Sequence, residues 1–177
     1  MFEIIDTPFS PIKTVRLDDG GDFRPCSTGL DIDNLKVRTM MERIETNHAN
    51  DQEIVASAAH TDKEIALENA WQEAIERISL AAWWALDRPF LAKFSDDTVE
   101  KIVRNHKIEI PESFSVHVGL VESVNPDYKI ACSIISNERD YPFAVLGGGC
   151  SKNAMQAAEK AIYESMQSWT ATNWIDS

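Results

Sequence analysis

The sequence predicts an α+β fold in which an antiparallel sheet packs against long, alanine-rich helices. Two segments, near 61–88 and 151–170, place small and apolar residues at helical spacing. Between them lie three stretches with alternating apolar residues, separated by short turn-forming sequences. Helices and strands therefore come in unequal runs instead of strict alternation, which is typical of the α+β class. The 177 residues, 44% of them hydrophobic, suffice for one ordinary core, so we expect a single domain over residues 1–177.

The first part of this domain, residues 1–54, is expected to contain short strands and a polar region. Apolar residues favour strands over 2–5 and 13–17. A weakly periodic stretch over 35–44 predicts a helix, and a loop is expected at 47–51. Residues 55–177 form the predicted core.

A long helix is the clearest element of that core. Thr61-Asp62-Lys63-Glu64 has the form of a capping box, and neither Gly nor Pro follows until Pro89. Small and apolar residues recur every four positions along it, at Ala66, Ala70, Ala74, Ile78 and Ala82. This stripe allows a neighbour to approach closely. By the same capping logic, a shorter helix is expected from Asp97 to about His106.

Three strands and a final helix complete the core. The strands are predicted over 115–121, 128–135 and 141–146, and short turns between them favour an antiparallel meander. Gly147, Gly148 and Gly149 are then expected to form a turn from strand to helix, with Ser151 as the helix cap.

Composition excludes several classes of protein. Lys and Arg number 17 against 29 Asp and Glu, so a net charge of -12 opposes binding to a nucleic acid backbone. No apolar run reaches the roughly 18 residues of a membrane span, and the N-terminus lacks the pattern of a signal peptide, so a cytoplasmic protein is expected. Three cysteines without metal-ligand spacing predict neither zinc nor disulfides.

A segment near the end of the chain is similar in sequence to the long helix. A shift of 91 residues superimposes Ala66, Ala70, Glu73 and Glu76 on Ala157, Ala161, Glu164 and Gln167. Ala and Glu are the residues that helices use most, so a true internal repeat and a chance match both remain open.

Acidic residues on these two helices are the candidate site. Glu73 and Glu76 lie three residues apart on one helical face, where a divalent cation would remove their repulsion. Glu164 and Gln167 repeat this geometry, and Arg77 could hold a phosphate oxygen. The alternative is that Glu73, Glu76 and Arg77 are simply the solvated face of an amphipathic helix. Likewise Gly148 and Gly149 could contact phosphate through backbone N–H groups or serve only as a flexible turn.

Two segments resemble a known family. Residues 66–77, which read ALENAWQEAIER, look like the E-A-I-E-R helix of the YcaO family. Residues 142–149, PFAVLGGG, followed by the E-x-x-Q spacing of Glu164 and Gln167, resemble its late strand and alanine-rich helix. The two matches occur in the family's order, so the chain is interpreted as a YcaO-like domain lacking roughly half of the full-length family.

The resemblance implies ATP-dependent phosphorylation of a peptide backbone amide oxygen, which yields azolines, thioamides or amidines. It makes Glu73, Glu76 and Glu164 ligands of Mg²⁺ around the ATP phosphates, Gln167 a polar neighbour and Arg77 a phosphate contact. Family members are markedly longer and use three such helices, where this sequence supplies two.

Three functions are therefore kept open. The first is a cyclodehydratase-like or thioamide-forming enzyme whose site is completed by a second chain. The second is a non-catalytic scaffold or peptide-recognition partner, and the third is an unrelated α+β domain. The apolar stripe and the five tryptophans leave surface to be covered, so we expect a homodimer or a companion modification enzyme. The family resemblance implies a precursor peptide as a further partner.

Overall fold

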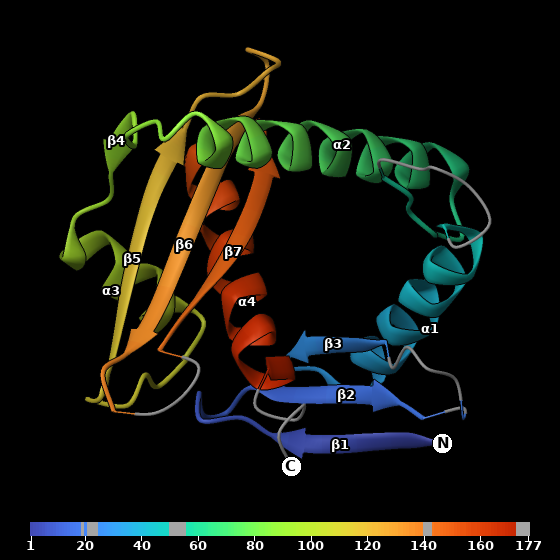
Figure 1. Cartoon of the computed structure of the whole chain (residues 1–177). Coiled ribbons are helices and arrows are strands. Elements are labelled where there is room, and N and C mark those ends of the chain that lie inside the picture. The colour runs from blue at the N-terminus through green and yellow to red at the C-terminus, as the bar shows by residue number, and fades with distance from the viewer. Residues whose placement is uncertain (19, 21–24, 50–55, 140–142, 173–177) are drawn as a thin grey trace.

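The computed structural model describes residues 1–18, 20, 25–49, 56–139 and 143–172, which fold into two antiparallel sheets and four helices (Figure 1). The smaller sheet has the order β1-β2-β3 and comprises β1 (Phe2–Asp6), β2 (Lys13–Leu17) and β3 (Cys26–Gly29). The larger has the order β4-β5-β6-β7 and comprises β4 (Ala92–Lys93), β5 (Phe114–Val121), β6 (Lys129–Asn137) and β7 (Ala144–Ser151). The α+β class predicted from the sequence is confirmed.

The helices connect and cover these sheets. Their bounds are α1 (Ile32–Ala49), α2 (Lys63–Ala85), α3 (Asp96–Asn105) and α4 (Ala154–Thr172). α4 packs along β7 and β6 on one face of the larger sheet, and α1 packs on β2 and β3. α2 crosses the other face of the larger sheet at one end and spans the distance to α1 (Figure 1). None of the helices in the described part of the chain combines the length and hydropathy of a membrane span.

The main core lies between the larger sheet and the helices α3 and α4. Trp169 of α4 is buried and meets the ring of Phe114 edge to face, with 4.8 Å between ring centroids. Phe9, from the loop between β1 and β2, packs on Phe114 at 5.2 Å and is fully buried. Because aromatic side chains bury large areas, these contacts fix the loop between β1 and β2 against the core of the larger sheet.

Several boundaries differ from those expected. The first helix covers 32–49, so residues 47–49 are helical and not part of a loop. The side chain that caps α2 is Asp62, not Thr61, and it accepts from Glu64 N–H and Ile65 N–H; Ser95 caps α3. Tyr141 and the following proline, expected to begin the last strand, lie outside the described residues.

The glycines at 147–149 are part of β7, so the prediction of a turn there is wrong. A Cβ at Gly147 would lie 2.2 Å from the backbone nitrogen of Ser165, and one at Gly149 would lie 2.1 Å from the carbonyl oxygen of Ala157. These glycines are needed because the backbone of α4 lies directly against the strand. On α4 itself, Asn153 caps the N-terminus through Met155 N–H and Gln156 N–H, in place of the expected Ser151.

Candidate functional site

A cavity of about 1010 Å³ opens between α1, α2, α4 and the edge strand β7. Eight of its lining side chains are charged residues that α1, α2 and α4 supply from three separate parts of the sequence; they are Arg38, Glu42, Glu73, Glu76, Arg77, Glu159, Lys160 and Glu164. We refer to this space as the carboxylate cavity. It contains every predicted site residue except Gly149.

The contribution of α2 follows from its helical spacing. Glu73 and Glu76 project into the cavity from adjacent turns, whereas Ile75 between them turns toward the sheet and is buried. Arg77 forms an ion pair with the Glu73 carboxylate, and Glu73 also accepts from Ser57 N–H at 3.2 Å. Glu73 and Glu76 are therefore partly enclosed by the cavity, whereas the side chain of Arg77 is exposed at its edge.

α4 supplies the facing wall. Glu164 accepts from the backbone N–H of Gly148 at 3.0 Å, and Gln167 donates to the carbonyl oxygen of Cys26 at 3.1 Å. Lys160 donates to Gln72 Oε1 and to the carbonyl oxygen of Cys150, both at 2.9 Å. α4 therefore brings the carboxylates of Glu159 and Glu164, the amides of Gln156 and Gln167 and the ammonium group of Lys160 to the site.

Gly148 separates the two helices at the centre of the site. Its N–H group donates to Glu164, and a Cβ at this position would lie 2.6 Å from Glu76 Oε1 of α2. Only glycine leaves that space for the Glu76 carboxylate. Gly149 turns toward α4 and does not line the cavity, so its predicted contact with phosphate is not supported by its position.

The crowded carboxylates have raised pKa values. Burial, and next the charge of Glu164, raise the pKa of Glu76 to about 8. Burial also raises the pKa of Glu164, although the hydrogen bond from Gly148 acts in the opposite direction. The pKa of Glu73 is raised by burial as well, and Arg77 opposes that shift. Burial thus disfavours the ionised forms of these carboxyl groups, and a cation bound among them would favour those forms.

The sequence did not identify the contribution of α1. Glu42 lines the cavity, and its pKa is raised by burial and by the nearby Glu73, while Arg38 opposes the shift. Glu45 accepts from Ala59 N–H, and burial raises its pKa to about 7. Glu42 and Glu45 have the same three-residue spacing as Glu73 and Glu76, and this repeated spacing was a signal that could have found them.

The donor set suits a magnesium ion that is shared with a phosphate ligand. Among the described residues, no three side chains of His, Cys, Asp or Glu are arranged to hold a metal ion by themselves. Mg²⁺ prefers oxygen ligands and is usually bound through one or two carboxylates together with substrate phosphates. The cavity offers such carboxylates and, in Arg38, Arg77 and Lys160, cationic groups for phosphate oxygens. The residues therefore fit a Mg²⁺-nucleotide better than an isolated metal ion.

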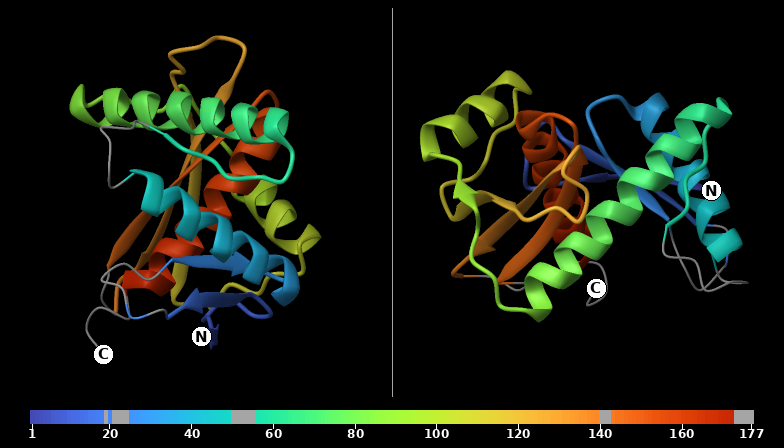
Figure 2. Two further views of the ribbon diagram at one scale, coloured as in Figure 1. Left: turned by 90° about the vertical axis from the view of Figure 1, so that its right-hand side faces the viewer. Right: turned by 90° about the horizontal axis from the view of Figure 1, so that it is seen from above.

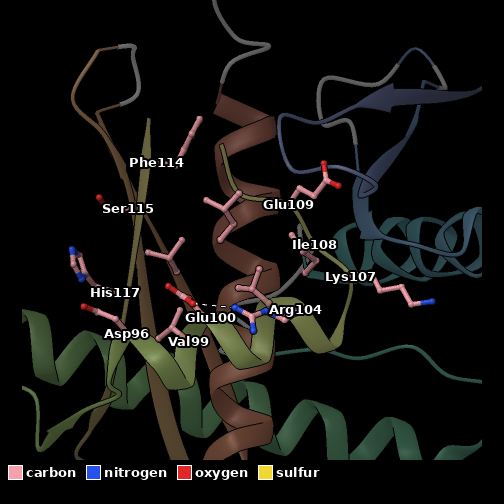
Figure 3. A pocket seen from close by; sticks show the side chains of 13 residues that line it. Asp96, Val99, Glu100, Arg104, Lys107, Ile108, Glu109, Phe114, Ser115 and His117 are labelled. Atoms are coloured by element: carbon pink, nitrogen blue, oxygen red, sulfur yellow. Dashed lines mark hydrogen bonds and ion pairs between the residues drawn. The ribbon is translucent and has the colours of Figure 1, made fainter. Parts of the chain in front are cut away.

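A second cavity, of about 790 Å³, lies between α3 and β5 (Figure 3). Its wall combines apolar side chains with exposed charges, including the Glu100–Arg104 ion pair at 3.2 Å. None of the predicted site residues lies there. Because it lacks a cluster of buried carboxylates, we place the candidate site in the carboxylate cavity.

Comparison with known proteins bears on the fold. No protein-family model matches the sequence, and no curated protein matches it. Among solved structures, the chain is similar to YcaO from Methanopyrus kandleri bound with AMPPCP and Mg²⁺, with a TM-score of 0.72 and 14% sequence identity. The fold is YcaO-like. The similarity covers 97% of this chain but only 63% of that chain.

The YcaO-like fold brings the two halves of the predicted repeat to one site. Glu73 and Glu76 of α2 line the same cavity as Glu164 and Gln167 of α4. Their shared location agrees with a repeat, although the origin of these helices by internal duplication stays a prediction. Metal and nucleotide binding by these residues also stay predictions.

Proposed function

We propose that the carboxylate cavity binds Mg²⁺-ATP and that this chain serves ATP-dependent activation of a peptide backbone amide. The observation that carries the proposal is the gathering of Glu42, Glu73, Glu76 and Glu164 around one cavity that also contains arginine and lysine side chains. Buried carboxylates with raised pKa values repel one another, and a divalent cation relieves that repulsion. The similarity to a YcaO bound with AMPPCP, an ATP analogue, and Mg²⁺ supports this choice of ligand.

The side chains divide into two roles. Glu73, Glu76 and Glu164 supply oxygen ligands for Mg²⁺, which, when bound, neutralises charge on phosphate oxygens. Arg77 and Lys160 line the same cavity and would contact the phosphate oxygens that remain. Gly148 keeps room between α2 and α4, so that the carboxylates of both helices reach one ligand.

Isothermal titration with Mg²⁺-ATP tests this function. Wild-type protein should release heat with a dissociation constant below millimolar, and EDTA should abolish the signal. Glu73→Gln and Glu164→Gln should each weaken binding at least tenfold, which corresponds to about 1.4 kcal/mol. The matched control is Glu112→Gln, because Glu112 is exposed and lies outside the cavity. No heat at millimolar nucleotide, or equal binding by all variants, would contradict the proposal.

A second candidate is a nucleotide-binding partner that is not itself catalytic. It is favoured by one observation, namely that the chain spans 63% of the matched YcaO chain. In this case Mg²⁺-ATP binds, but phosphate is released only when a companion modification enzyme supplies the remaining groups. Phosphate release by the isolated protein in the presence of a precursor peptide separates the two candidates, because only an active site that is complete in this chain, or in its homodimer, gives turnover.

A further inference from the structure

The outward face of α2 carries an apolar stripe that no described part of the chain covers. Only Ile75 and Ser79 of this helix are buried. On the neighbouring face of the helix Leu67 is 70% exposed, Trp71 is 54% exposed and Ile78 is 47% exposed. Seen from above, α2 runs across the top of the molecule with no other described helix or strand over it (Figure 2). Contiguous exposed apolar surface of this kind marks a contact with another molecule.

The spacing of the stripe is that of a helix-pairing seam. Its members are separated by four and three residues in turn, and they are Leu67, Trp71, Ala74, Ile78, Ala81 and Ala85. Alternation of four and three keeps one face of a helix turned toward a partner helix. Ala81 and Ala85 are exposed, so the second half of the seam is accessible as well as the first.

The order of large and small side chains along the seam identifies the partner. We propose that α2 pairs with α2 of a second copy of this chain, antiparallel, around a two-fold axis beside residue 76. In this register every large side chain meets a small one: Leu67 lies opposite Ala85, Trp71 opposite Ala81, and Ile78 opposite Ala74. A parallel pair would instead stack Trp71 on Trp71 and Ala74 on Ala74, which leaves clashes and voids along one seam. The antiparallel two-fold is also the usual symmetry of a homodimer.

Charges at the ends of α2 complement this arrangement. Lys63 and Glu64 begin the helix, whereas Asp87 and Arg88 directly follow it. The antiparallel register brings the first turn of α2, with Lys63 and Glu64, close to the segment of the second copy that follows α2 and carries Asp87 and Arg88. Arg88 also pairs with Glu122 in its own chain, so it serves as the centre of a small charge network. Antiparallel helices additionally bring dipole ends of opposite sign together.

The area available is at the lower end of what a specific dimer needs. A helix of 23 residues is about 34 Å long and roughly 10 Å wide. Pairing along the full length therefore covers several hundred Å² on each copy, compared with about 800 Å² per partner in a standard interface. We accordingly expect a dimer that dissociates on dilution. This inference does not depend on nucleotide binding.

Sedimentation velocity tests the interface. The wild-type chain should sediment as a dimer at tens of micromolar and as a monomer on dilution. Ala81→Glu places a charge opposite Trp71 of the second copy and should give a monomer at all these concentrations. Because Ala81 is exposed, the far-ultraviolet circular dichroism spectrum of this variant should match that of the wild type. Asn69→Glu is the matched control, since Asn69 is also exposed on α2 but lies outside the seam, and it should remain dimeric.

Cross-linking tests the direction of pairing. Trp71→Cys and Ala81→Cys are prepared as separate variants and mixed under oxidising conditions. The antiparallel register predicts a covalent heterodimer in the mixture and none from either variant alone, because equivalent residues are then about 15 Å apart along the helix. Self-linking of each variant would indicate a parallel pair and overturn the proposal. A wild-type monomer at 100 µM would also overturn it, and would leave the stripe for a different chain.

Discussion

Glu76 provides the sharpest test of the electrostatics of the carboxylate cavity. Its side chain is held between α2 and β7, and its pKa is raised from 4.5 to about 8 by burial and by Glu164. The folded protein therefore binds a proton that the unfolded chain releases. Stability from this group is fully present below about pH 4.5 and is lost as the pH rises through about 8.

The replacement Glu76→Gln removes this titration and should stabilise the protein without ligand. A shift from 4.5 to about 8 corresponds to a ceiling of about 5 kcal/mol above pH 8, at 1.36 kcal/mol per pKa unit. The gain should fall below about 1 kcal/mol at pH 5, where folded Glu76 is protonated. Since the cavity is large enough to admit water, we expect a measured gain of about 1–3 kcal/mol at pH 8.5.

Urea unfolding followed by tryptophan fluorescence measures this gain at pH 5 and pH 8.5. Glu112→Gln, at an exposed position, serves as the control and should change the free energy of unfolding by less than about 0.5 kcal/mol. Addition of Mg²⁺-ATP at pH 8.5 should reverse the order, because the wild type gains binding energy that the variant lacks. If Glu76→Gln were destabilising at pH 8.5, or if its effect did not depend on pH, the carboxylate would not be in the crowded environment described above.

Substitutions at three further positions test other parts of the fold and the site. Gly149→Ala should destabilise the protein by about 3 kcal/mol in urea unfolding, because its Cβ would lie 2.1 Å from the carbonyl oxygen of Ala157. A decrease of less than about 1 kcal/mol in the free energy of unfolding would show that α4 can move away. Asp62→Ala should cost about 1 kcal/mol through loss of the α2 cap, and Asp62→Asn should restore most of it, whereas equal losses would rule out capping. Lys160→Met removes a cation that lowers the pKa of Glu76, so the pH at which the free energy of unfolding falls should move upward. The affinity for Mg²⁺-ATP should also decrease. An unchanged pH profile of stability would argue against coupling between Lys160 and Glu76.

The sequence predicted the elements whose signals are local. α2 was recognised because an uninterrupted run follows a cap and precedes Pro89, and both signals act within a few residues. The meander was recognised from alternation and short turns. The placement of Glu73, Glu76 and Glu164 on one cavity was expected through a family resemblance, since spacing alone does not bring residues 73 and 164 together.

The features that were missed depend on contacts between distant segments. β3 consists of only four residues, and its strand conformation is imposed by pairing with β2. Because glycine is typical of turns, the sequence predicts a turn at Gly147 and Gly149, yet here these residues permit the close approach of α4 to β7. Glu42 went unrecognised because α1 has a weak apolar pattern, and its role depends on facing α2 across the cavity.

The construction of β7 explains how carboxylates from two helices come together. In most sheets, side chains project from both faces of a strand and keep the elements packed on it at a distance. Here consecutive glycines remove the side chains from both faces of β7, so α4 approaches from one side and Glu76 of α2 from the other. The hydrogen bond from Gly148 N–H to Glu164 then holds the second carboxylate at the same edge. The arrangement concentrates negative charge at a cost to the stability of the unliganded protein. A substitution that adds a methyl group at Gly148 should therefore displace Glu76 and impair ligand binding more than it impairs folding, since a flexible side chain can yield where the backbone of α4 cannot.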